Sequence, residues 1–76
     1  MPTIVQLGNL KIQLYADDHN PPHFHVVTPD HDAQVSISDL SILRGSLRRS
    51  DYEQAVAWAR EHMKEISDEW NRLNHR

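Results

Sequence analysis

Four of the six histidines lie between residues 19 and 31, in a segment that contains two consecutive prolines. The segment reads Asp18-His19-Asn20-Pro21-Pro22-His23-Phe24-His25. An imidazole with its usual pKa of about 6.5 occupies both protonation states near neutral pH, so two histidines can serve as base and acid. His19, His23 and His25 are therefore candidate catalytic residues for metal-independent RNA cleavage. One imidazole would take the proton of a ribose 2′-hydroxyl, and a second would protonate the departing 5′-oxygen.

A cation would stabilise the charge that develops on the phosphate oxygens during such a cleavage. Arg44 is the candidate for this role, with Arg48 as an alternative. Lys11, Tyr15 and Ser36 are expected on the same polar sheet face as the histidines.

Two other readings of the histidines stay open. In the first, His23 and His25 bind a divalent transition metal, since their Cα atoms on one strand face would be about 6.6 Å apart, with His19, His31 or an Asp as a further ligand. In the second, His19 and His23 hold the Pro21-Pro22 turn by hydrogen bonds and have no chemical role. The sequence leaves the cis or trans state of Asn20-Pro21 and Pro21-Pro22 open.

The first candidate strands, residues 3–7 and 10–15, are joined by Gly8-Asn9, a pair suited to a type II′ hairpin turn. Pairing Leu7 with Leu10 brings Val5 opposite Ile12. This register gathers the apolar side chains on one face.

A second hairpin is expected from residues 23–28 and 33–38, with Thr28 opposite Ala33 and Phe24 opposite Ile37. Because side chains alternate across a strand, the pleat that buries Phe24 should expose His23 and His25. Residues 39–49 fit either a fifth strand or a capping loop.

The C-terminal third predicts one long helix over residues 51–74, opened by a capping box of Ser50 and Glu53. Such a helix would be about 36 Å long, whereas a six-residue strand covers only about 20 Å. The helix should therefore either bend or extend beyond the sheet. The second alternative is the interpretation preferred here, with Trp70 packing on a second copy of the chain or on another partner.

Composition sets the class of protein. The chain has 76 residues, no cysteine, 25% charged residues and a formal charge of −3, which predicts one small domain over residues 1–76 in a reducing compartment. Its longest apolar run, residues 55–59, predicts no membrane span and no secretory signal. The expected fold class is α+β: an antiparallel sheet of four to five short strands packed against one long C-terminal helix.

The start of the chain, the motif from Asp18 to His25, Gly45, and the helix with Trp58 and Trp70 resemble the small bacterial family called domain of unknown function 4160. The resemblance implies a bacterial cytoplasmic protein with a small protein partner encoded nearby, similar to the toxin half of a two-gene toxin–antitoxin module. Ribonuclease action through the clustered histidines, with no cofactor, is the function hypothesis that follows. The alternative is a non-enzymatic module that binds a metal or another protein.

Overall fold

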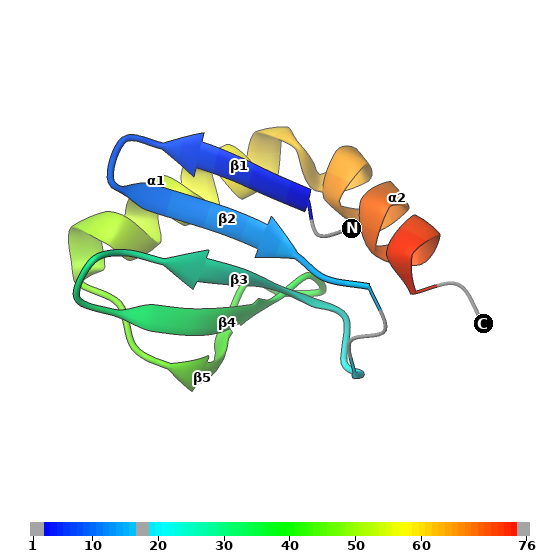
Figure 1. The fold of residues 1–76 in the computed structure, drawn as a ribbon, viewed down its shortest axis with the longest axis horizontal. Coiled ribbons are helices and arrows are strands. Elements are labelled where there is room, and N and C mark those ends of the chain that lie inside the picture. Colours follow the sequence, from blue (N-terminus) through cyan, green and yellow to red (C-terminus); the bar gives the residue numbers. More distant parts are fainter. Residues whose placement is uncertain (1–2, 17–18, 75–76) are drawn as a thin grey trace.

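The computed structural model describes residues 3–16 and 19–74. Within these residues it has five strands followed by two helices: β1 (Thr3–Leu7), β2 (Leu10–Leu14), β3 (His23–Val27), β4 (Asp32–Ser36), β5 (Ile42–Gly45), α1 (Arg49–Glu61) and α2 (Met63–Leu73). The strands form one antiparallel sheet in chain order, and both helices lie on one side of it (Figure 1). The α+β class is confirmed, while the single long helix is wrong.

The first hairpin has the predicted register. Leu7 pairs with Leu10, and Val5 pairs with Ile12. Gly8 has a φ of +63°, which glycine adopts without steric cost and which a II′ turn requires at its first central position. Two independent constraints, the turn type and the apolar alternation, agree on this pairing.

The second hairpin is shifted by two residues from the predicted register. Phe24 pairs with Val35, not with Ile37. The cause is the turn: the Thr28 N–H donates to the His31 carbonyl at 2.8 Å, and the His31 N–H donates to Thr28 Oγ1 at 3.0 Å. Because of these bonds, the first strand of the hairpin ends one residue earlier than predicted, and the second strand begins one residue earlier than predicted. A shift of two leaves every side chain on its expected face, so the apolar pattern alone does not detect it.

Residues 39–49, for which the sequence fits either a fifth strand or a capping loop, contain strand β5. It pairs with β4 at the sheet edge, and a register shift between Gln34 and Val35 leaves Leu43 as an extra residue. All four β5 residues are exposed. Leu40, just before the strand, is buried and is held by a hydrogen bond from the Tyr52 hydroxyl to its carbonyl at 2.5 Å.

The predicted long helix is divided at His62, which ends α1 and precedes α2. Its backbone N–H donates to the Ala59 carbonyl at 3.0 Å, while its ring Nδ1 lies 2.7 Å from the Trp58 carbonyl oxygen. In an unbroken helix, the His62 N–H would donate to Trp58 instead. The imidazole therefore replaces a helical hydrogen bond, and the chain changes direction here.

The start of α1 also differs from the prediction. The helix begins at Arg49, and its N-cap residue, Arg48, makes no side-chain capping bond. Glu53, expected in a capping box with Ser50, forms an ion pair with Arg49 at 3.0 Å.

Because of the break at His62, α2 follows the sheet and Trp70 is buried in the chain's own core at 6% exposure. The preferred interpretation, in which Trp70 packs on another chain, is therefore wrong. The buried core joins the helix-facing side chains of β2, β3 and β4 to both helices: Leu10, Ile12, Leu14, Phe24, Val26, Val35, Ile37, Leu40, Ala55, Val56, Ala59, Ile66 and Trp70.

Gly45 and Gly8 provide a matched test of the β4–β5 contact. Gly45 has a φ of +79°, and an added Cβ would lie 2.2 Å from the Asp32 carbonyl oxygen, whereas an added Cβ at Gly8 would meet nothing within 4 Å. We expect Gly45→Ala to lower the free energy of unfolding by more than about 2 kcal/mol, and Gly8→Ala by about 1 kcal/mol for its positive φ alone. Equal losses in urea denaturation would contradict the observed β4–β5 packing.

Candidate functional site

Three histidine rings lie in succession at the start of β3, and we call His19, His23 and His25 the histidine row. The ring centroids of His19 and His23 are 5.2 Å apart, and those of His23 and His25 are 5.0 Å apart. Tyr15 meets His25 edge-on at 4.8 Å. The structure therefore brings together the three histidines that the sequence singled out.

The members of the histidine row differ in exposure. His23 is 1% exposed, and its ring lies 5.3 Å from the ring of Trp70. Its Nδ1 donates to the Pro21 carbonyl at 2.7 Å, across the Pro-Pro segment. The prediction that His23 points into solvent is wrong, because α2 and the Pro21 turn enclose the beginning of β3. His25 is half-buried and His19 is exposed, so solvent reaches both of these side chains.

The Pro21 segment has the hydrogen bond that the structural reading expected of His23. The Asn20-Pro21 peptide bond is cis. Asp18, the first residue of the motif, lies outside the described residues.

A row of directly opposed residues crosses the sheet on the face away from the helices. Gln13 of β2 pairs with His25 of β3, His25 with Gln34 of β4, and Gln34 with Arg44 of β5. We call these four residues the polar ladder. Neighbouring strands are about 4.8 Å apart, so the Cα atoms of His25 and Arg44 are separated by about 10 Å. Both side chains project from the same face toward the space above Gln34.

The polar ladder lines a shallow hollow of about 180 Å³ with Tyr15 at one end. The Tyr15 hydroxyl donates to the Gln13 side-chain carbonyl oxygen, which orients the phenol ring against His25. Both helices lie on the opposite side of the sheet, so no element covers this face within the described ranges 3–16 and 19–74 (Figure 1). The hollow can therefore admit an extended ligand.

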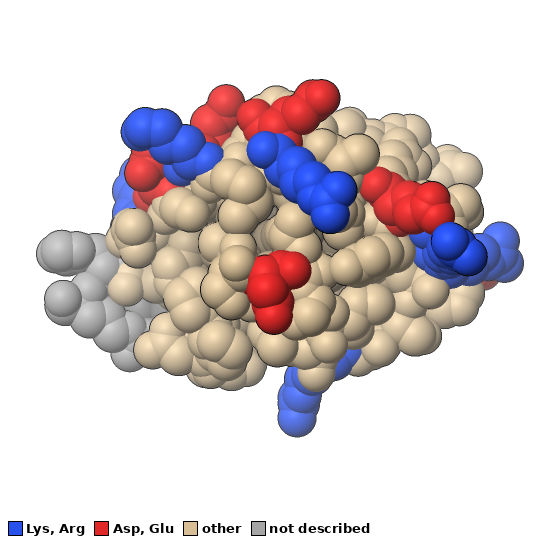
Figure 2. Space-filling model, turned by 180° about the vertical axis from the view of Figure 1, so that it is seen from behind, with Lys and Arg blue, Asp and Glu red and all other residues tan. Residues whose placement is uncertain are grey.

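The charges around the hollow favour an anion at its Arg44 end. Arg44 forms no ion pair with any residue in the described part of the chain. Asp32 also lines the hollow and is its one carboxylate among the lining residues. The helix side, seen in Figure 2, carries Lys, Arg, Asp and Glu interspersed, without a field of one sign.

The other predicted site residues lie elsewhere. Arg48 is paired with Asp30 at 3.3 Å beside the β3–β4 turn. His31 belongs to that same turn, at the opposite end of β3 from the histidine row. Ser36, expected on the open face, is buried and its hydroxyl bonds with Ser38 at 2.9 Å.

The geometry offers little to a metal. Across residues 3–16 and 19–74, no three His, Asp or Glu side chains converge to hold an ion. His23 Nδ1 is also engaged with the Pro21 carbonyl oxygen. Metal binding by His19, His23 and His25 remains a prediction that this arrangement does not favour.

Gln13, Gln34 and Asp32 were not among the candidate site residues that the sequence indicated. Gln13 lies beside His25 through the β2–β3 pairing, and Gln34 lies beside it through the β3–β4 register, which is shifted by two residues from the predicted one. The period-2 polar pattern places Gln13 and Gln34 on the same sheet face as His25, but it does not determine which residue lies opposite His25.

The chain belongs to the family described as Domain of unknown function (DUF4160), which matches residues 9–71. The matched region includes the whole histidine row, the polar ladder and nearly all of both helices. Neither a curated protein nor a solved structure matches the chain. None of the described helices is both long and apolar enough to span a membrane.

The same substitution at two alternate positions of β3 tests the different burial of the histidines. We expect His23→Ala to lower the free energy of unfolding by about 2–4 kcal/mol, because it leaves a cavity beside Trp70. His25→Ala should cost less than about 1 kcal/mol, because its ring is half-buried on the open face. Urea denaturation followed by circular dichroism measures both, and a larger loss for His25→Ala would contradict this placement.

Proposed function

We propose that this protein cleaves RNA without a metal, as the toxin half of a bacterial two-gene module that acts in the cytoplasm and is held by a small protein partner. The observation that carries the proposal is the polar ladder, which aligns His25 and Arg44 on the uncovered sheet face. His25 and Arg44 both line one polar hollow, where they would serve as general base and cation, and Arg44 forms no ion pair with any described residue.

In the proposed reaction, His25 takes the proton of the ribose 2′-hydroxyl, and the 2′-oxygen forms a bond to phosphorus. The bond from phosphorus to the 5′-oxygen breaks, and His19 donates a proton to that oxygen. The products are a 2′,3′-cyclic phosphate and a free 5′-hydroxyl. Arg44 stabilises the negative charge on the phosphate oxygens during the transfer.

The other side chains position these groups. His23 lies between the ring contacts of His19 and His25, and its hydrogen bond to the Pro21 carbonyl holds its own orientation. Tyr15 packs edge-on against His25 and is itself held by Gln13. Gln34, between His25 and Arg44, has donors and an acceptor for a ribose or phosphate.

The formal charge of −3 agrees with a site of limited extent. Non-specific affinity for nucleic acid grows with the number of phosphates that are neutralised. One arginine without an ion pair among the described residues suits contact with one or two phosphates of an RNA strand on the open face rather than with a long duplex.

RNA cleavage by purified protein in the presence of EDTA tests this proposal. We expect His25→Ala to reduce the cleavage rate at least 100-fold, because a general base contributes about 10²–10⁴-fold. Arg44→Ala should reduce the rate about 10- to 100-fold without abolishing it, as expected of an electrostatic contribution. Asp32→Asn should tighten RNA binding, because it removes a carboxylate from the hollow. Growth inhibition on induction should follow the same order.

Arg49→Ala is the matched control, since it removes an arginine from α1 on the other side of the sheet. It should leave the cleavage rate unchanged. Cleavage that persists in His25→Ala, or that disappears equally in Arg49→Ala and Arg44→Ala, would refute the assigned site. Loss of cleavage in EDTA, restored by a transition metal, would instead support the metal-binding alternative.

A further inference from the structure

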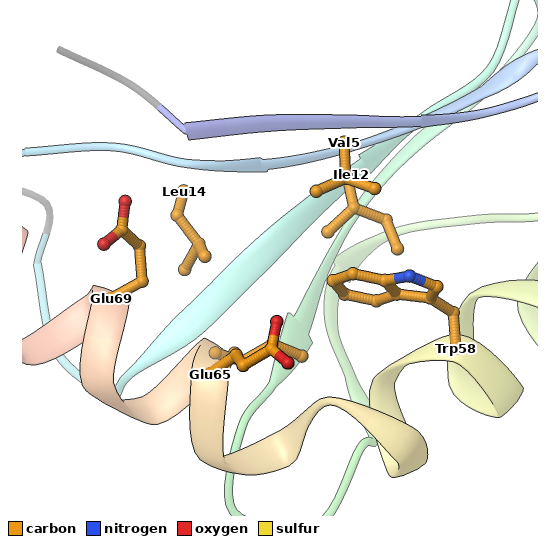
Figure 3. Close-up of a pocket in the computed structure, with 7 residues that line it drawn as sticks. Val5, Ile12, Leu14, Trp58, Glu65 and Glu69 are labelled. Carbon is orange, nitrogen blue, oxygen red and sulfur yellow. The ribbon is translucent and has the colours of Figure 1, made fainter.

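A second hollow, of about 210 Å³, lies on the helix side of the sheet beneath β1 and β2. We call it the edge hollow. Its apolar lining is Val5, Ile12, Leu14, Trp58 and Ile66, and Glu65 and Glu69 complete it. Figure 3 shows the Trp58 ring beneath Val5 and Ile12, with Glu65 and Glu69 projecting from α2 into the same gap.

The edge hollow lies where the helices approach β2 more closely than β1. β1 is the edge strand of the sheet, and its helix-facing side chains pack only partly against the core. Val5 and Leu7, which face the helices, are consequently only half-buried. The volume is below the roughly 300 Å³ at which pockets for drug-sized ligands begin, so one apolar side chain fits it better than a metabolite.

The backbone of β1 is open along the same edge. The two-residue turn makes Leu7 and Leu10 a hydrogen-bonded pair, and such pairs alternate along an antiparallel ladder. The N–H groups of Ile4 and Gln6 therefore point away from β2. An extended segment added here would gain main-chain hydrogen bonds and would place alternate side chains over the edge hollow.

The charge beside the edge hollow indicates which type of residue its occupant carries next to the apolar side chain. Glu65 is exposed and has no ion pair with any other residue in the described part of the chain. Glu69 is already bound to Arg72 by two contacts of 2.7 Å. Trp58 is stacked on His62 at 4.3 Å and packed against the core, so Glu65 is the group that sets the charge here. A basic residue is therefore favoured next to the apolar one.

We propose that β1 accepts an antiparallel strand from a partner protein, with an apolar side chain in the edge hollow and a Lys or Arg two residues later beside Glu65. Residues two apart in a strand share a face and are separated by about 6.6 Å, which spans the distance from the Val5 position to the Thr3 position. The surface is separate from the polar ladder, and it rests on the proposed function only for the expectation that a small protein partner exists.

A second copy of this chain fits the edge hollow less well. Two-fold pairing of β1 with β1 would bring the carboxylates of Glu65 and Glu69 toward their own symmetry mates. It would also present Thr3, Ile4, Val5, Gln6 and Leu7, a strand without a basic residue. Charge complementarity thus favours a different protein.

Binding of capped six-residue peptides, measured by calorimetry and by Trp fluorescence, tests the proposal. The probe is a threonine peptide that carries Leu and, two positions later, Lys. Two control peptides replace the Lys with Glu or the Leu with Ser. We expect the probe to bind and both controls to bind at least ten-fold more weakly. Equal binding of all three would overturn the proposal, as would no binding of the probe at millimolar concentration.

Protein variants then locate the peptide. Glu65→Lys should weaken binding about five- to ten-fold, while Glu53→Lys, the same charge reversal on α1, should leave it unchanged. Gln6→Pro removes one outward N–H at a sheet edge, where proline is tolerated, and should weaken binding at least ten-fold. If Gln6→Pro does not fold, the comparison of Glu65→Lys with Glu53→Lys decides: equal affinities would refute the site.

Two further measurements separate this proposal from the alternatives. His25→Ala should bind the probe as the wild type does, so a failure of RNA cleavage would not affect this result. Sedimentation should show a monomer at micromolar concentration. A dimer that Glu65→Lys or Gln6→Pro dissociates would mean that a second copy occupies the edge, which would overturn the assignment to a different protein.

Discussion

The hydrogen bond between the His62 imidazole and the Trp58 carbonyl oxygen organises the helical layer of this protein. It interrupts the helix after Glu61, and the redirected α2 buries Trp70 against the sheet and His23. Both helices lie on one side of the sheet, closer to β2 than to β1. The enclosed start of β3 thus follows from one local replacement of a backbone hydrogen bond, whereas the opposite sheet face is left uncovered.

The uncovered face of the sheet combines a half-buried imidazole, a phenol held by a glutamine, and an arginine that forms no ion pair with any described residue. Strand pairing aligns His25, Gln34 and Arg44 in a single row, so their spacing is a property of the sheet and not of flexible loops. Sites on regular elements hold their geometry better than sites on loops. His23 is buried, so His19 and His25 are the members of the histidine row that solvent reaches.

The parts of the fold that sequence predicted well are those in which two local signals agree. Gly8 and the apolar alternation both specify the first hairpin, and its register is confirmed. The second hairpin depends on whether the Thr28 hydroxyl closes the turn, which composition does not reveal, and the predicted register is wrong by two residues. The buried state of His23 was missed because it depends on the course of α2. The direction of α2 depends in turn on the hydrogen bond between the His62 side chain and the Trp58 carbonyl oxygen, four residues earlier. The sequence pattern around this bond is that of a continuous helix.

The central claim is that His25 and Arg44 act together on a phosphodiester at the uncovered sheet face. NMR titration with a dinucleotide that carries a 2′-O-methyl group, and so cannot be cleaved, tests it most directly. The account predicts that the side-chain resonances of His25 and Arg44 and the amide of Gln34 shift together with one apparent Kd, while those of α1 stay unchanged. Shifts confined to the helices, or an Arg44 resonance that does not move when the dinucleotide binds, would contradict it.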